Sequence, residues 1–161
     1  MNVASLQEVK SELQNLSEKE LVELCIHLAK YKKDNKEYLS YLLFQSQNRE
    51  GYLLQIKAEI ELQFAEIDGQ KNVYFIKKSL RKILRILNKY CKYVGDKSNT
   101  VDLLLFYCLK MKEHHIPLQN SVALENIFLS QIKKIKTITA NLHEDLQADN
   151  IREMENIIEM K

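Results

Sequence analysis

The sequence predicts an all-α protein of seven or eight helices. The chain of 161 residues contains only three Gly and one Pro, which argues against a turn-rich β-sandwich or β-barrel. Leu, Lys, Glu and Gln are abundant, and these residue types favour helix. Apolar residues recur three or four positions apart, as they do on one face of a helix. We therefore expect a single domain over residues 1–161. Its helices should form antiparallel hairpins, in either an ARM/HEAT-like curved array or an irregular helical bundle.

Three helices are expected before residue 48. The first covers residues 3–15, and the second runs from a capping-box pattern at Ser17 and Glu20 to about residue 33. Asp34 or Asn35 is expected to cap a third helix that reaches residue 47. The side chains expected to face inward are Val3, Leu6, Val9 and Leu13 in the first helix, Leu21, Leu24, Cys25, Leu28 and Tyr31 in the second, and Tyr38, Tyr41, Leu42 and Phe44 in the third.

The fourth segment, residues 51–68, has an ambiguous pattern. Residues 58–64 alternate between apolar and polar types, which is typical of a strand. We predict a helix, because Ala, Glu, Gln and Leu favour helix and the segment has no β-branched cluster. A helical projection gives two opposite apolar stripes, so we expect the helix to lie between two neighbours. One stripe is Leu53, Ile56, Ile60, Phe64 and Ile67, and the other is Leu54, Ala58, Leu62 and Ala65.

The fifth segment, residues 72–94, is the most charge-polarised part of the chain. Residues 71–97 contain nine Lys or Arg and one acid, whereas the whole chain has a net charge of +2. Gly69 and Gly95 are expected to end the fourth and fifth helices. The apolar side of the fifth helix is Val73, Ile76, Leu80, Ile83, Leu84, Leu87, Tyr90, Cys91 and Val94. The opposite side carries Lys78, Arg81, Lys82, Arg85, Lys89 and Lys92.

Three helices are expected in the rest of the chain. Asn99 or Thr100 should cap a sixth helix through about residue 112, whose apolar run over 103–109 predicts deep burial. The only proline, Pro117, breaks the chain before a seventh helix capped by Ser121, and an eighth covers about 145–160. The inward-facing residues are Leu124, Phe128, Ile132, Ile135, Ile138 and Leu142 in the seventh and Ile151, Met154, Ile157 and Ile158 in the eighth.

Residues 20–34 and 100–114 resemble each other at an offset of 80 positions, which matches Leu24 to Leu104 and two lysines to two lysines. A true internal duplication would favour stacked helical hairpins. Two apolar helices can also agree to this extent by chance, so both interpretations stand.

No catalytic, metal or cofactor site is expected. His114 and His115 are adjacent, and neighbouring positions on a helix diverge by about 100°, so the pair should not chelate one ion. Glu20, Glu23 and His27 share a helix face but lack the Glu-x-x-His spacing of di-iron bundles. No Gly-x-Ser-x-Gly elbow or nucleotide-binding fingerprint occurs. The thiols of Cys25, Cys91 and Cys108 lie in apolar stripes, and we expect them to be buried and inert.

The basic side of the fifth helix is the candidate site for an anionic partner. It could bind nucleic-acid phosphates, an acidic protein or lipid head groups. Tyr74 and Tyr93 flank it and could stack on bases. Alternatively, it is the solvated face of a long exposed helix, whose charge acids of the preceding segment could offset. These acids are Glu59, Glu61, Glu66 and Asp68.

A cytoplasmic location is expected. The first residues have no apolar stretch of signal-peptide length, and the longest apolar run, residues 103–109, is far shorter than the roughly 20 residues that cross a bilayer. Three cysteines, an odd number, suit reduced thiols in the cytoplasm.

Residues 16–24 read Leu-Ser-Glu-Lys-Glu-Leu-Val-Glu-Leu and are followed by Leu-Ala-Lys at 28–30 and Asn-Lys-Glu-Tyr-Leu at 35–39. This stretch resembles uncharacterised small all-helical bacterial proteins in which a Leu-Ser-x-Glu-Glu-Leu-like opening leads into helical hairpins. The resemblance covers about the first 45 residues and implies no activity. The leading hypothesis is a non-catalytic helical protein-interaction or structural module with an unidentified protein partner. The alternatives are nucleic-acid binding through residues 72–94 and, third, an enzyme with a site assembled from distant helices.

Overall fold

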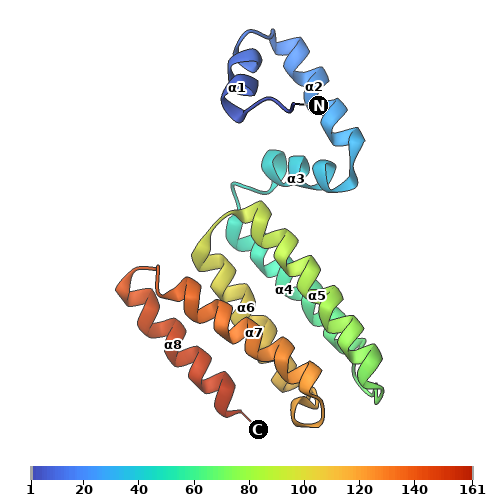
Figure 1. The fold of residues 1–161 in the computed structure, drawn as a ribbon, viewed down its shortest axis with the longest axis vertical. Helices are drawn as coiled ribbons and strands as arrows, with labels where there is room; N and C mark the ends of the chain where they lie inside the picture. The colour runs from blue at the N-terminus through green and yellow to red at the C-terminus, as the bar shows by residue number, and fades with distance from the viewer. Residues whose placement is uncertain (1, 161) are drawn as a thin grey trace. The chain divides into compact units, whose positions relative to one another are not determined.

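The computed structural model describes residues 2–160, and this part of the chain contains eight α-helices and no strand. The predicted all-α class and the number of helices are therefore confirmed. In chain order the elements are α1 (Leu6–Gln14), α2 (Glu18–Tyr31), α3 (Lys33–Phe44), α4 (Arg49–Ala65), α5 (Val73–Val94), α6 (Lys97–Glu113), a short 3-10 turn η1 (Leu118–Asn120), α7 (Val122–Thr139) and α8 (Glu144–Glu159), and Figure 1 labels the α-helices. The chain divides into two compact units that meet between Gln47 and Asn48, which we call unit 1 and unit 2. The single domain expected over residues 1–161 stays a prediction.

Unit 1 contains α1, α2 and α3. α1 and α2 both begin with a capping box, in which the N-cap serine and a glutamate three residues later exchange hydrogen bonds with each other's backbone amides. The box at Ser17 was predicted, whereas the one at Ser5 and Glu8 was not. α2 and α3 pack against each other, and the side chain of Asn35 donates a hydrogen bond of 2.8 Å to the carbonyl of Leu28 at the end of α2. The predicted cap at Asp34 or Asn35 is therefore wrong, and α3 starts after Lys32, whose backbone is extended.

Unit 1 buries very little of its apolar surface. Among residues 2–47, Tyr41 is the only fully buried hydrophobic side chain. The predicted inner face of α2 is wrong, because Leu24, Leu28 and Tyr31 are 37%, 54% and 76% exposed. The helical periodicity of α2 is correct, but α3 alone covers little of this face. Other exposed apolar residues of unit 1 are Val3, Leu6, Val9, Val22, Ile26, Tyr38, Leu42, Leu43 and Phe44.

Unit 2 is a bundle built around α6, which packs against α4, α5, α7 and α8 (Figure 1). The deep burial predicted for residues 103–109 is confirmed, since α6 places most of this run at the centre of the core. α6 begins three or four residues earlier than predicted, because the Asp96 side chain, and not that of Asn99 or Thr100, acts as the cap by accepting the amide of Asn99. Within α6 the fully buried side chains are Val101, Leu103, Leu104, Leu105, Tyr107, Cys108 and Met111.

α4 differs from its prediction on one side. The stripe through Ile56, Ile60 and Phe64 is buried, but the opposite stripe is on the surface, where Leu54 and Leu62 are 68% and 70% exposed. The expectation of a helix sandwiched between two neighbours is therefore wrong. The helical assignment itself, against the strand-like alternation of residues 58–64, is confirmed.

The last two helices cover one side of α6. In α7, Ser121 occupies the predicted N-cap position, but its side chain makes no capping hydrogen bond. Four of its six predicted inward residues are buried, and Ile138 and Leu142 are half-buried. α8 buries Met154 and Ile157, while the predicted inward residues Ile151 and Ile158 are 42% and 43% exposed. No helix within residues 2–160 combines the length and the apolar character needed to cross a membrane.

Candidate anion-binding face

The candidate site is one side of α5, which we call the basic face: Lys78, Arg81, Lys82, Arg85, Lys89 and Lys92. α5 begins at Asn72, whose side chain accepts the amide of Tyr74 at 2.9 Å, and it ends at Gly95, which has a left-handed φ of 67°. Both ends match the prediction.

The core fixes the rotation of α5 about its own axis. Its buried side chains lie on the predicted apolar side, and five of the six basic-face residues are exposed, with Lys89 half-buried. The buried set is Ile76, Leu80, Ile83, Leu87 and Val94. Turning the basic face inward would expose this set to water at a cost of several kcal/mol, at about 25 cal/mol per Å² of apolar surface. The cations are therefore held on the outside by packing.

Most of the acids expected to neutralise the basic face have other partners. Glu61 pairs with Lys110 of α6, and its second oxygen lies 3.4 Å from Nε2 of His114. Oδ1 of Asp68 lies 2.7 Å from Nδ1 of the same histidine. Glu59 accepts a hydrogen bond of 2.7 Å from the Tyr90 hydroxyl. The acidic end of α4 thus contacts α6 and the tyrosine side of α5.

Hydrogen bonding at Glu61 and Lys110 changes the pKa values of both groups. The hydrogen bond from Lys110 holds the pKa of the Glu61 carboxyl below its ordinary value, and it outweighs the opposing effect of burial. Burial on its own would lower the pKa of Lys110, but hydrogen bonds to Glu113 and Glu61 together raise it. Both groups are therefore ionised at neutral pH, and this ion pair joins α4 to α6.

The basic face itself has few internal partners. Within residues 2–160, no carboxylate forms an ion pair with Lys78, Arg81, Lys82, Arg85 or Lys92. The ammonium of Lys89 lies 5.4 Å from the centre of the Tyr90 ring. Glu61 and Asp68, two of the four acids that could offset the basic face, pair with Lys110 and His114 instead. A solvated basic face stays the alternative to a binding site.

The surface at the first half of α5 is hollowed. A shallow hollow of about 550 Å³ is lined by Tyr74, Lys77, Lys78, Arg81, Leu84 and Arg85. Tyr74, predicted as a flanking aromatic residue, is 60% exposed at one end of it. Tyr93 does not line this hollow, and its ring packs edge-on against the ring of Tyr90, with 6.2 Å between the ring centres. Lys77 and Leu84 were not predicted as part of the site, although their spacing of three and ten residues from Tyr74 places them on its side of the helix.

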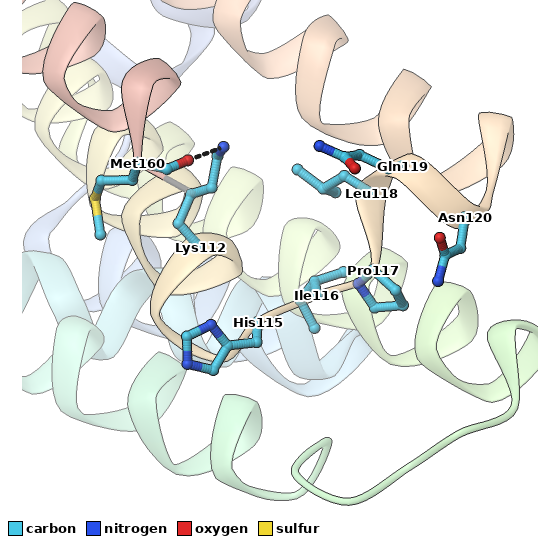
Figure 2. A pocket seen from close by; sticks show the side chains of 8 residues that line it. All are labelled: Lys112, His115, Ile116, Pro117, Leu118, Gln119, Asn120 and Met160. Carbon is cyan, nitrogen blue, oxygen red and sulfur yellow. Dashed lines mark hydrogen bonds between the residues drawn. The ribbon is translucent and has the colours of Figure 1, made fainter.

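A second hollow of about 550 Å³ lies where α6 leads into η1, near the end of α8 (Figure 2). The Lys112 ammonium in its wall donates hydrogen bonds to the carbonyls of Met160, at 2.5 Å, and Ile158, at 3.3 Å. It therefore satisfies carbonyls at the end of α8, as a basic side chain near a helix C-terminus does. The remaining lining residues are His115, Ile116, Pro117, Leu118, Gln119 and Asn120, which bring together no second charged group.

The two adjacent histidines lie just after α6 and have different surroundings. His114 stacks on Phe64 and contacts the acids of α4, while His115 is exposed and lines the hollow of Figure 2. Residues 2–160 hold no group of three or more His, Cys, Asp or Glu side chains arranged to bind a metal ion.

The cysteines are free but not equally buried. Cys108 is fully buried, and burial raises the pKa of its thiol to about 12. Cys91 is half-buried, and burial also raises its pKa. Cys25 is exposed, so the prediction that all three thiols are buried is wrong. The reason is the uncovered face of α2 described above.

Comparisons of the chain with protein-family models, with curated proteins and with solved structures find no match. The basic face and its surroundings are therefore the features of this chain from which a function can be inferred.

Proposed function

We propose that this protein is a non-catalytic helical module that binds a polyanion, the phosphate backbone of a nucleic acid, through the basic face of α5. The observation that carries the proposal is the engagement of Glu61 and Asp68 by Lys110 and His114. An array of cations on the exposed side of a stable helix raises the local concentration of anionic ligands. Internal acids that paired with these cations would weaken the effect, and Glu61 and Asp68 pair elsewhere.

The length of the array favours a polymer over a small anion. Lys78 and Lys92 are separated by about 21 Å along the helix axis, at 1.5 Å per residue. A small anion would contact one or two of these side chains, whereas a row of phosphates can contact most of them. An anionic membrane surface fits less well, because the apolar side of α5 is buried in unit 2 and cannot insert into lipid.

The exposed apolar side chains of unit 1 favour the protein partner expected from the sequence as a second candidate function. The cytoplasmic location is also part of the proposal.

The test is the binding of a fluorescently labelled nucleic acid to the full chain, measured by anisotropy over a range of salt concentrations. If all six cations contact phosphates on a duplex, the slope of log affinity against log salt is about −5. The double reversal Arg81→Glu, Arg85→Glu removes two contacts, so it should make this slope shallower by about 2 and weaken binding at low salt.

The matched control is Lys10→Glu, Lys19→Glu, which reverses two exposed lysines of unit 1 and makes the same change in net charge. It should leave the slope unchanged. Circular dichroism would establish that all variants are folded. Absence of binding at low salt, or equal effects of the two double reversals, would contradict the proposal.

A further inference from the structure

The hollow on α5 combines cations with an exposed aromatic ring. Its lining contains four basic side chains, and Tyr74 stands at its N-terminal end with 60% of its surface exposed. A basic groove with aromatic side chains is the arrangement that binds single-stranded nucleic acids, because each base offers a π-face for stacking while phosphates contact the cations.

The position of Tyr74 relative to the cations is fixed. It lies in the first turn of α5, where its amide is bonded to the Asn72 side chain. Its ring packs edge-on against Phe75, with 5.4 Å between the ring centres and 77° between the planes. Lys78 and Arg81 follow on the same side of the helix, about 6 and 10 Å further along the axis. A base stacked on Tyr74 would therefore place the neighbouring phosphates beside Lys78 and Arg81.

The exposure of Tyr74 has no structural explanation within unit 2. Ile76, two positions later, supplies the core contact of this turn and is 2% exposed, whereas Tyr74 and Phe75 are 60% and 49% exposed. Large aromatic side chains normally contribute burial to a core, so two adjacent exposed rings beside a basic hollow indicate a surface for contact.

We infer that the hollow binds single-stranded nucleic acid, with one unpaired base stacked on Tyr74 and the adjoining phosphates on Lys78, Arg81 and Arg85. This inference rests on the proposed function. Stacking on Tyr74 would make the protein prefer single strands to duplexes, which the cations alone would not do. In a duplex both faces of a base are covered by its neighbours, so the tyrosine has nothing to stack on.

The experiment compares three ligands on the full chain: a labelled single strand of about 12 nucleotides, the duplex of the same sequence, and vesicles containing phosphatidylserine. Tyr74→Ala should weaken single-strand binding roughly tenfold, as loss of one base–aromatic stack does. Duplex binding should not change, and the salt slope for the single strand should stay the same because no charge is altered. Tyr74→Phe keeps the ring and should retain binding.

The control variant is Tyr31→Ala, which removes an exposed tyrosine of unit 1 and should affect neither ligand. The inference is overturned if Tyr74→Ala weakens single strand and duplex equally, if Tyr74→Phe is as weak as Tyr74→Ala, or if vesicles bind more tightly than either nucleic acid. Tight binding with no preference between strand and duplex would overturn this inference and leave the proposed function standing. If the protein binds no nucleic acid at low salt, both this inference and the proposed function are contradicted.

Discussion

Glu61 connects two helices of unit 2 through its two carboxylate oxygens. One oxygen pairs with Lys110 and the other approaches His114, whose ring stacks on Phe64 with 5.4 Å between the ring centres. The side chains of Lys110 and His114 are only 15% and 12% exposed, so these interactions are shielded more than an ordinary surface ion pair.

The lowered pKa of Glu61 predicts a specific dependence of stability on pH. A carboxyl whose pKa is lower in the folded state stabilises the fold above its ordinary value of 4.5, and this contribution is lost as pH falls through the folded pKa. Glu61→Gln should therefore reduce the free energy of unfolding by about 1 kcal/mol at pH 7, a figure limited by the partial exposure of the carboxylate.

Urea unfolding of wild type and Glu61→Gln at pH 7 and at about pH 2.5 would measure this difference, which should disappear at the lower pH. Glu66→Gln, at the same end of α4 but outside the pair, is the control and should change stability by less than about 0.5 kcal/mol. A difference that persists at low pH would show that Glu61 acts through packing and not through its charge.

At the scale of single elements, α5 depends on its C-terminal glycine. Gly95 has a φ of 67°, and a Cβ placed there would meet no atom within 4 Å. Any cost of replacing it therefore comes from the left-handed backbone and not from steric contact with neighbours.

Gly95→Ala should lower the free energy of unfolding by about 1 kcal/mol, because an L-residue with a Cβ is strained in this region. Gly95→Asn should lose less, since Asn tolerates the left-handed conformation better. Thermal or urea unfolding of the three proteins gives the order directly. Equal stability of the Ala and Asn variants would contradict the assignment of the cost to φ.

Comparison among the helices shows what local sequence patterns can predict. The apolar and basic sides of α5 follow from residue spacing, and both appear where they were expected. The same spacing on α2 and on the second side of α4 also gave the correct helical faces, but these faces are exposed. Spacing identifies the apolar side of a helix, while its burial depends on whether a neighbouring element covers it.

The partners of the acids could not be predicted for a related reason. Glu61 and His114 are 53 positions apart, and nothing near either residue specifies the other. The cations of the basic face were found from the sequence, but the pairing of Glu61 and Asp68 with Lys110 and His114 depends on how α4 packs against α6. The position of the α6 cap could not be predicted for another reason. Four of the five residues 96–100 are of types that cap helices, and the structure uses the first of them, Asp96.

At the scale of the whole molecule, the two units differ in how much they bury. Unit 2 contains almost every fully buried side chain of residues 2–160, whereas Tyr41 is the only one in unit 1. A segment of this size with so little buried apolar surface is expected to be marginally stable.

Hydrogen exchange should therefore show faster amide exchange throughout α1, α2 and α3 than in the central residues of α6. Slow exchange in α2 comparable to α6 would contradict this prediction. If unit 1 binds the expected protein partner, adding that partner should slow exchange in these three helices.

The separation of core positions from surface positions on α5 affects how the basic face can change over evolution. The positions that hold the helix in the core and the positions that carry the basic face share no residue. Substitutions can therefore alter the charge, reach or ligand preference of the outer side without weakening the inner one. A lineage could tune or abandon the surface one residue at a time, and a designer could rewrite it on the same backbone.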